Sequence, residues 1–70
     1  MSHETLAELL RRRPFEPFAV RMSTGERYEV WHPEMALLLK TKLMIAEPDS
    51  DRTTICSRLH MSEIEVPMPV

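Results

Sequence analysis

The fold is decided by residues 18–30, which read FAVRMSTGERYEV. Apolar and polar side chains alternate on both sides of Gly25, the only glycine of the chain, as in a strand with one buried face. The apolar members are Phe18, Val20 and Met22 before the glycine and Tyr28 and Val30 after it. Because glycine readily adopts the positive φ that tight turns need, the turn is predicted at residues 23–26. The stretch therefore predicts a β-hairpin.

The length of the turn follows from the side chains that the pairing brings together. A two-residue loop at residues 24–25 would set Val20 opposite Glu29, which places a charge on the apolar face. A loop that is longer by one residue pairs Val20 with Val30 instead and keeps that face apolar. We therefore predict the longer loop, with a β-bulge at or beside Gly25.

An amphipathic helix is predicted at residues 2–13, ahead of the hairpin. Leu6, Leu9 and Leu10 recur at the spacing that places them on one helix face. Acidic side chains lie near its start and arginines near its end, which matches the helix dipole. Pro14 ends the helix. A helix this short is not stable alone, so its leucine face is expected to pack on the rest of the protein.

Residues 34–46 allow two interpretations. Their Met, Ala, Leu, Lys and Glu residues favour a helix over residues 34–45, starting behind Pro33. Apolar side chains would surround most of that helix, however, because only residues 40–42 are polar. Two short strands joined by a turn at residues 40–42 explain the pattern better. A second hairpin is therefore favoured over the helix.

The remaining sequence predicts two further strands. Residues 48–52, PDSDR, are typical of a turn, and residues 53–57 are rich in β-branched side chains. A tight crossing turn then leads to a last strand at residues 62–66. The alternation in that strand predicts that Ile64 and Val66 face the core.

Residues 14–34, PFEPFAVRMSTGERYEVWHPE, resemble a group of small uncharacterised bacterial proteins. These share a PF-x-PF strand, a glycine hairpin, an HP-[DE] break and a final IE-V strand, and the resemblance covers most of the chain. It implies no function. Similar chains have a glycine turn near residues 40–42, where this chain has Lys-Thr-Lys. The order of elements is also similar, more loosely, to the Sm-like and SH3-like small barrels, which implies architecture only.

The predicted fold is α+β, in one domain over residues 1–70. It consists of an N-terminal helix at residues 2–13 and a twisted antiparallel sheet of about five short strands over residues 18–66. This sheet is expected to resemble a small Sm-like or SH3-like barrel, with a tail at residues 67–70. No apolar run approaches the length that crosses a membrane, and a single cysteine suits a reducing compartment. We expect a cytoplasmic protein with no membrane partner.

The residues do not form a recognisable catalytic or metal centre. One cysteine, Cys56, excludes a disulfide within the chain and the Cys-rich frames of structural zinc. His60 lies four residues beyond Cys56, but a second ligand pair is missing because His32 is isolated. We predict no enzyme and no cofactor.

Two surfaces remain as candidate contact sites. Trp31 is predicted on the outer face of the first hairpin, beside Glu29. With Met35 and Phe15 it is a candidate interface for a second copy or a protein partner, because aromatic residues and methionine are enriched at interfaces. A small domain without disulfides or metal also favours self-association. The first function hypothesis is therefore a non-catalytic interaction module that forms a homo-oligomer.

The alternative function is weak nucleic-acid binding, of RNA on an Sm-like ring. Arg11, Arg12 and Arg13 form the densest basic run and could contact phosphates. The net charge of −2 argues against binding through the overall field of the protein. Compensation of the helix dipole explains the three arginines better. Nucleic acid is therefore the less favoured partner.

Overall fold

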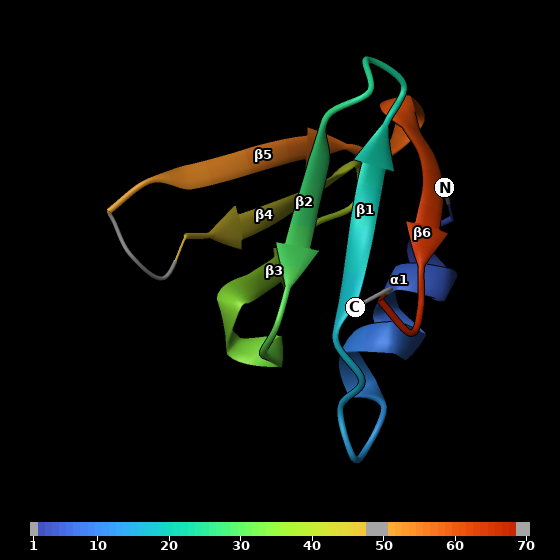
Figure 1. Ribbon diagram of the computed structural model, residues 1–70, viewed down its shortest axis with the longest axis vertical. Coiled ribbons are helices and arrows are strands. Elements are labelled where there is room, and N and C mark those ends of the chain that lie inside the picture. Colours follow the sequence, from blue (N-terminus) through green and yellow to red (C-terminus); the bar gives the residue numbers. More distant parts are fainter. Residues whose placement is uncertain (1, 48–50, 69–70) are drawn as a thin grey trace.

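One helix and two three-stranded antiparallel sheets make up the computed structural model, which describes residues 2–47 and 51–68 (Figure 1). The first sheet has the strand order β2-β1-β6 and the second the order β3-β4-β5. The elements are α1 (His3–Arg11), β1 (Phe18–Met22), β2 (Arg27–Val30), η1 (Pro33–Met35), β3 (Ala36–Leu38), β4 (Lys42–Ala46), β5 (Thr53–Ser57), η2 (Arg58–His60) and β6 (Met61–Glu65).

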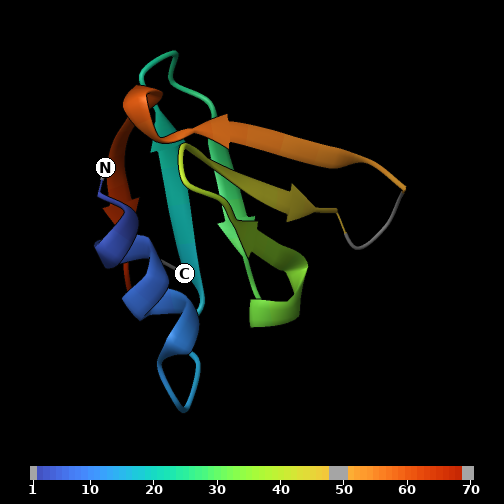
Figure 2. The same cartoon turned by 180° about the vertical axis from the view of Figure 1, so that it is seen from behind.

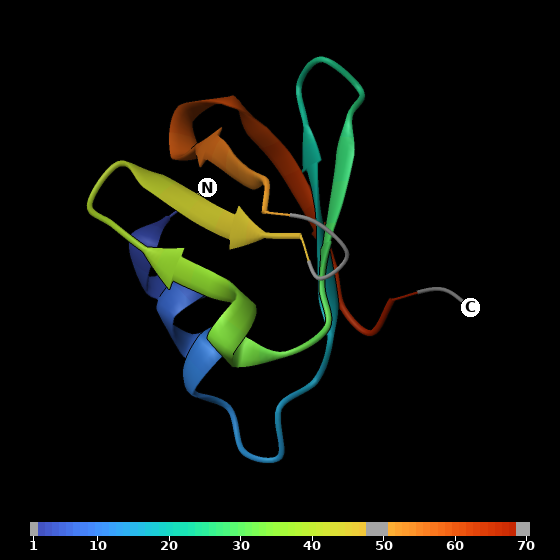
Figure 3. The same ribbon diagram turned by 90° about the vertical axis from the view of Figure 1, so that its left-hand side faces the viewer.

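The two sheets cross each other steeply and enclose the core between their apolar faces (Figures 1 and 3). Alternation along each strand sends every second side chain into this core. Both sheets contribute fully buried residues, such as Phe18 and Val20 of β1 and Leu43 of β4. The buried cluster consists of Leu6, Leu9, Phe18, Val20, Val30, Leu43, Ile45, Cys56 and Met61.

The leucine face of α1 packs into this core, as the sequence predicts. Leu6 and Leu9 are buried, and the helix lies beside the edge strand β3. Figures 1 and 2 show α1 on one side of β1 and β2, and strands β4 and β5 extending to the other side. The Ser2 hydroxyl caps the helix by accepting from the Thr5 amide at 3.1 Å. The helix is therefore held at its start by a cap and along its length by burial.

The helix is shorter than the predicted residues 2–13. It ends at Arg11, and Arg12 already has an extended backbone with a ψ of 134°. Proline disfavours helical geometry in the residue before it, so Arg13 cannot continue the helix into Pro14. Arg12 still closes the last turn, because its amide donates to the Glu8 carbonyl at 3.0 Å.

The first hairpin has the predicted three-residue loop, but its pairing differs from the prediction. Val20 lies opposite Tyr28, and not opposite Val30, which pairs with Phe18. The amide of Met22 donates to the Glu26 carbonyl at 2.7 Å, so the loop is residues 23–25. The reason is Gly25, whose φ is +96°. The predicted pairing would have moved the loop to residues 24–26 and given this bulge position to a glutamate instead of the glycine.

The second hairpin confirms the strand interpretation of residues 34–46. Strands β3 and β4 pair antiparallel, and the Leu39 amide donates to the Lys42 carbonyl at 2.8 Å across the turn. Only η1, a single 3-10 turn behind His32, is helical in this stretch. Strand β5 has the predicted residues 53–57, whereas the predicted turn at 48–52 includes residues 48–50, which lie outside the described residues.

Several expectations about the sheet are wrong. The structure has six strands and not about five, and they form two sheets that do not close into a barrel. The last strand also starts one residue earlier than predicted, at Met61, which is buried opposite Met22. A bulge in the β1–β6 pairing allows both Met61 and Ile64 to reach the core. Val66 lies beyond the strand and is exposed.

No helix in the described part of the chain is long and apolar enough to cross a membrane.

The positive φ of Gly25 predicts a cost for any side chain at this position. Gly25→Ala should lower the free energy of unfolding by about 1–2 kcal/mol, because a left-handed backbone is strained by a Cβ atom. No atom lies within 4 Å of the place where that Cβ would stand, so the cost is conformational and not steric. Urea denaturation measures it, with Ser23→Ala as the control in the same loop. Equal stability of the two variants would contradict this explanation of the register.

Candidate functional site

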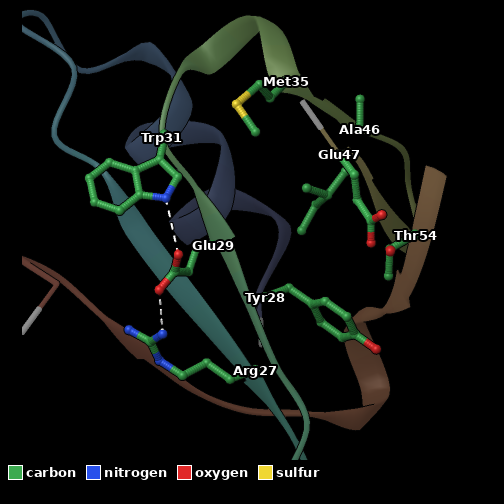
Figure 4. A pocket seen from close by; sticks show the side chains of 9 residues that line it. Arg27, Tyr28, Glu29, Trp31, Met35, Ala46, Glu47 and Thr54 are labelled. Carbon is green, nitrogen blue, oxygen red and sulfur yellow. Dashed lines mark hydrogen bonds and ion pairs between the residues drawn. The ribbon is translucent and has the colours of Figure 1, made fainter. Parts of the chain in front are cut away.

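A hollow of about 410 Å³ lies where the two sheets part, between β2 and the β4–β5 hairpin (Figure 4). It exists because two separate three-stranded sheets leave a gap on this side, which no helix covers among the described residues. Its floor reaches Ile45, a core residue. The residues that line it are Arg27, Tyr28, Glu29, Trp31, Met35, Ile45, Ala46, Glu47 and Thr54.

Trp31 stands at the edge of this hollow and is 49% exposed. Its indole Nε1 donates to the Glu29 carboxylate at 3.0 Å, and the Arg27 guanidinium donates to the same carboxylate at 2.5 Å. The two donors, Arg27 first, hold the pKa of Glu29 below its usual range. The indole N–H is therefore held by Glu29 while about half of the Trp31 surface remains accessible.

Tyr28, from the same segment as Trp31, also lines the hollow (Figure 4). Its hydroxyl donates to the Glu26 carboxylate at 2.6 Å. This hydrogen bond, together with burial, raises the pKa of Tyr28 to about 12. The phenol is thus a hydrogen-bond donor that stays neutral at physiological pH. It lacks the ionisation near neutral pH that a general base needs.

The outer face of the first sheet carries a ladder of ion pairs. Arg21 binds Glu63 at 2.9 Å, and Arg27 binds Glu65 at 2.5 Å, in each case linking neighbouring or next-neighbouring strands. Arg27 reaches from β2 across β1 to β6 because Ala19, between Glu29 and Glu65 in the register, has only a methyl group. Both arginines of this ladder are paired, and its three carboxylates, of Glu29, Glu63 and Glu65, exceed its guanidinium groups by one.

The predicted interface residues do not all lie together. Trp31 and Met35 line the same hollow, and Trp31 shares the outer face with Glu29 as expected. Phe15 is not part of it. Its ring packs against the core with its centroid 6.1 Å from that of Phe18. The segment before β1 thus uses Phe15 to cover the core, and Trp31 and Met35 are the two candidate residues that line the hollow.

The arginine run lies at the end of α1 and is exposed, and two of its members contact the protein itself. Arg12 forms ion pairs with Glu8 and Glu16, each at 3.5 Å. The Arg13 guanidinium donates to the carbonyl of Leu10 at 3.1 Å and to that of Arg12 at 2.8 Å. The two hydrogen bonds of Arg13 satisfy carbonyl groups at the carboxyl end of the helix. Nucleic-acid binding by Arg11, Arg12 and Arg13 stays a prediction.

The sequence interpretation missed a second apolar surface, on the outer face of the second sheet. Leu37, Met44 and Ile55 lie opposite one another on β3, β4 and β5 and form a row across the sheet. Leu37 is 58% exposed and Ile55 is 60% exposed. Consecutive apolar residues could have indicated this surface, because they give a strand two apolar faces. We call these three residues the apolar row.

Cys56 is buried, and burial raises the pKa of its thiol. Buried thiols of this kind are poor nucleophiles. Among the residues that the structure describes, no three His, Cys, Asp or Glu side chains lie together so that they could hold a metal ion. No protein-family model, no curated protein and no solved structure matches the chain.

Tyr28 is the only tyrosine, so its titration can be followed by absorbance alone. Its pKa should be about 12, against about 10 for a free side chain. Because folding raises this pKa, the stabilisation is fully present below pH about 10 and is lost as the pH rises through the folded pKa. Glu26→Gln should bring the pKa back toward its ordinary value, whereas Glu63→Gln, on the outer face, should leave it unchanged. The same pKa in both variants would show that Glu26 is not the cause.

Proposed function

We propose that the protein is a non-catalytic interaction module that associates with a second copy of itself and contacts protein partners. The observation that supports this proposal is that apolar side chains are exposed in two defined places. One is the hollow with Trp31 and Met35, and the other is the apolar row. Aromatic, methionine and aliphatic side chains of this kind make up the centres of protein interfaces.

The apolar row is suited to a second copy. It crosses the sheet without a charged side chain, so two copies can stack face to face, as sheets do in sandwiches. Charged residues flank the row on its two sides, along the direction of the strands. Lys42 precedes Met44 on β4 on one side, and Glu34 lies beside the groove of Leu37, Met44 and Ala46 on the other. A two-fold axis along the apolar row would bring the Lys42 side of each copy over the Glu34 side of its partner.

The hollow is suited to a protein segment rather than to chemistry on a small molecule. Trp31 and Tyr28 supply large rigid surfaces with a polar tip, and both tips are already hydrogen-bonded within the protein. The arrangement therefore offers shape and apolar area, with two carboxylates, those of Glu29 and Glu47, among its lining residues. These are features of recognition surfaces.

The native mass in solution tests the self-association. We expect the wild-type chain of 8.2 kDa to form a defined oligomer by light scattering. Ile55→Lys should reduce it to a monomer, because a charge would be buried in the centre of the contact. Leu59→Lys is the matched control: Leu59 is 90% exposed on η2, away from the apolar row, and should leave the oligomer intact.

Two results would contradict the proposal. One is a wild-type monomer with the apolar row exposed at all concentrations. The other is salt-dependent retention of RNA that is lost when Arg11, Arg12 and Arg13 are replaced by alanine, which would assign the chain to nucleic-acid binding instead.

A further inference from the structure

The outer edge of β2 has free backbone groups. Strand β2 is the edge of its sheet, since the order is β2-β1-β6. The Met22–Glu26 pair is hydrogen-bonded through the backbone, and such pairs alternate along an antiparallel ladder. Tyr28 and Val30 therefore direct their N–H and C=O groups to β1, and Arg27 and Glu29 direct theirs away from it. No described residue bonds to these outward groups.

The hollow lies directly beside this edge. Tyr28 and Trp31 of the β2 segment form one wall, and Ile45 and Thr54 of the second sheet form the floor and the other wall. The β4–β5 hairpin extends past the edge of β2 in the views of Figures 1 and 2. A chain that paired with β2 would thus run between this hairpin and the edge, with every second side chain directed into the hollow.

We infer that the free edge of β2 binds an extended segment of a partner protein as an added strand. This inference rests on the proposed function, since it takes the hollow as a contact surface. The backbone groups of Arg27 and Glu29 would supply the hydrogen bonds, and the hollow would supply side-chain specificity. Strand addition of this type is a general mode of peptide recognition.

The walls determine which segment fits. A residue paired with Glu29 places its side chain on the outer face, beside that carboxylate. This face holds three carboxylates (Glu29, Glu63 and Glu65) against the guanidinium groups of Arg21 and Arg27, so a basic side chain is favoured there. In the partner segment, the residues before and after the one paired with Glu29 would point into the hollow, where Tyr28 and Ile45 favour apolar side chains. The expected segment reads apolar–basic–apolar.

A second copy is a poor occupant of this edge. Pairing of β2 with the β2 of another copy about a two-fold axis would keep both β4–β5 hairpins on the same side of the joined sheet. Each hairpin extends past its own β2 edge (Figure 1). The two hairpins would therefore compete for the same space, whereas a segment of extended chain carries no such obstacle.

The probe is a display library of linear peptides of about eight residues, the length of an ordinary strand. Peptides that bind the full chain should alternate apolar and basic residues, and the tightest one is then synthesised. Glu29→Pro removes an outward N–H but no bond to β1, and edge strands tolerate proline in this orientation. We expect at least about tenfold weaker binding, the equivalent of one hydrogen bond. Glu29→Gln, which keeps the N–H, should weaken binding less.

A second measurement does not depend on the folding of the proline variant. N-methylation of alternate residues of the peptide removes either the N–H groups directed to β2 or those directed away from it. One of the two methylated peptides should lose binding to the wild-type protein and the other should keep it. Equal binding of both would overturn strand addition, as would a library from which no peptide is enriched.

The failure of this inference and the failure of the proposed function give different results. If Trp31→Ala loses the peptide while Glu29→Pro keeps it, the hollow is a contact surface but the edge of β2 is not a binding strand. The self-association through the apolar row is measured separately, by the native mass of Ile55→Lys.

Discussion

The packing of the leucine face of α1 between the two sheets is the contact on which the rest of the structure depends. Each sheet has only three strands, and each must cover one apolar face. The sheets cross steeply and do not close, so their shared core would be open to water on two sides. Leu6, which is fully buried, and Leu9 cover one of these sides. In return, the core stabilises a helix of nine residues that would not persist alone.

The other side of the core has no such cover, and this difference determines where the protein can make contacts. The edge of β2, the half-exposed Trp31 and the hollow all lie on that side. The outer faces of the two sheets also differ. That of the first sheet is occupied by paired charges such as Arg21 with Glu63, whereas that of the second carries the apolar row. The described residues thus leave apolar side chains uncovered in two separate places, the hollow and the apolar row.

Local pattern was sufficient to predict most of the elements but not their assembly. The alternation in residues 18–30 and the polar interruption at 40–42 identified both hairpins, because strand periodicity is a local property. The pairing of Val20 was wrong because it depends on which loop residue takes the positive φ, and only Gly25 takes it without strain. The apolar row was missed because sequence alone does not show which apolar face of β3, β4 and β5 is buried. Sequence alone also does not show that Phe15 packs against the core, since core and interface use the same side chains.

Amide hydrogen exchange of the free protein at low concentration tests whether the outer edge of β2 is unpaired. Along β2 the amides of Tyr28 and Val30 should be protected by their bonds to β1, and those of Arg27 and Glu29 should exchange much faster. The amides of α1 that lie before its exposed arginine end should be protected, because the helix packs on the core. Protection of Arg27 and Glu29 as strong as that of Tyr28 would contradict this view, because it would mean that the edge of β2 is already covered in the free chain.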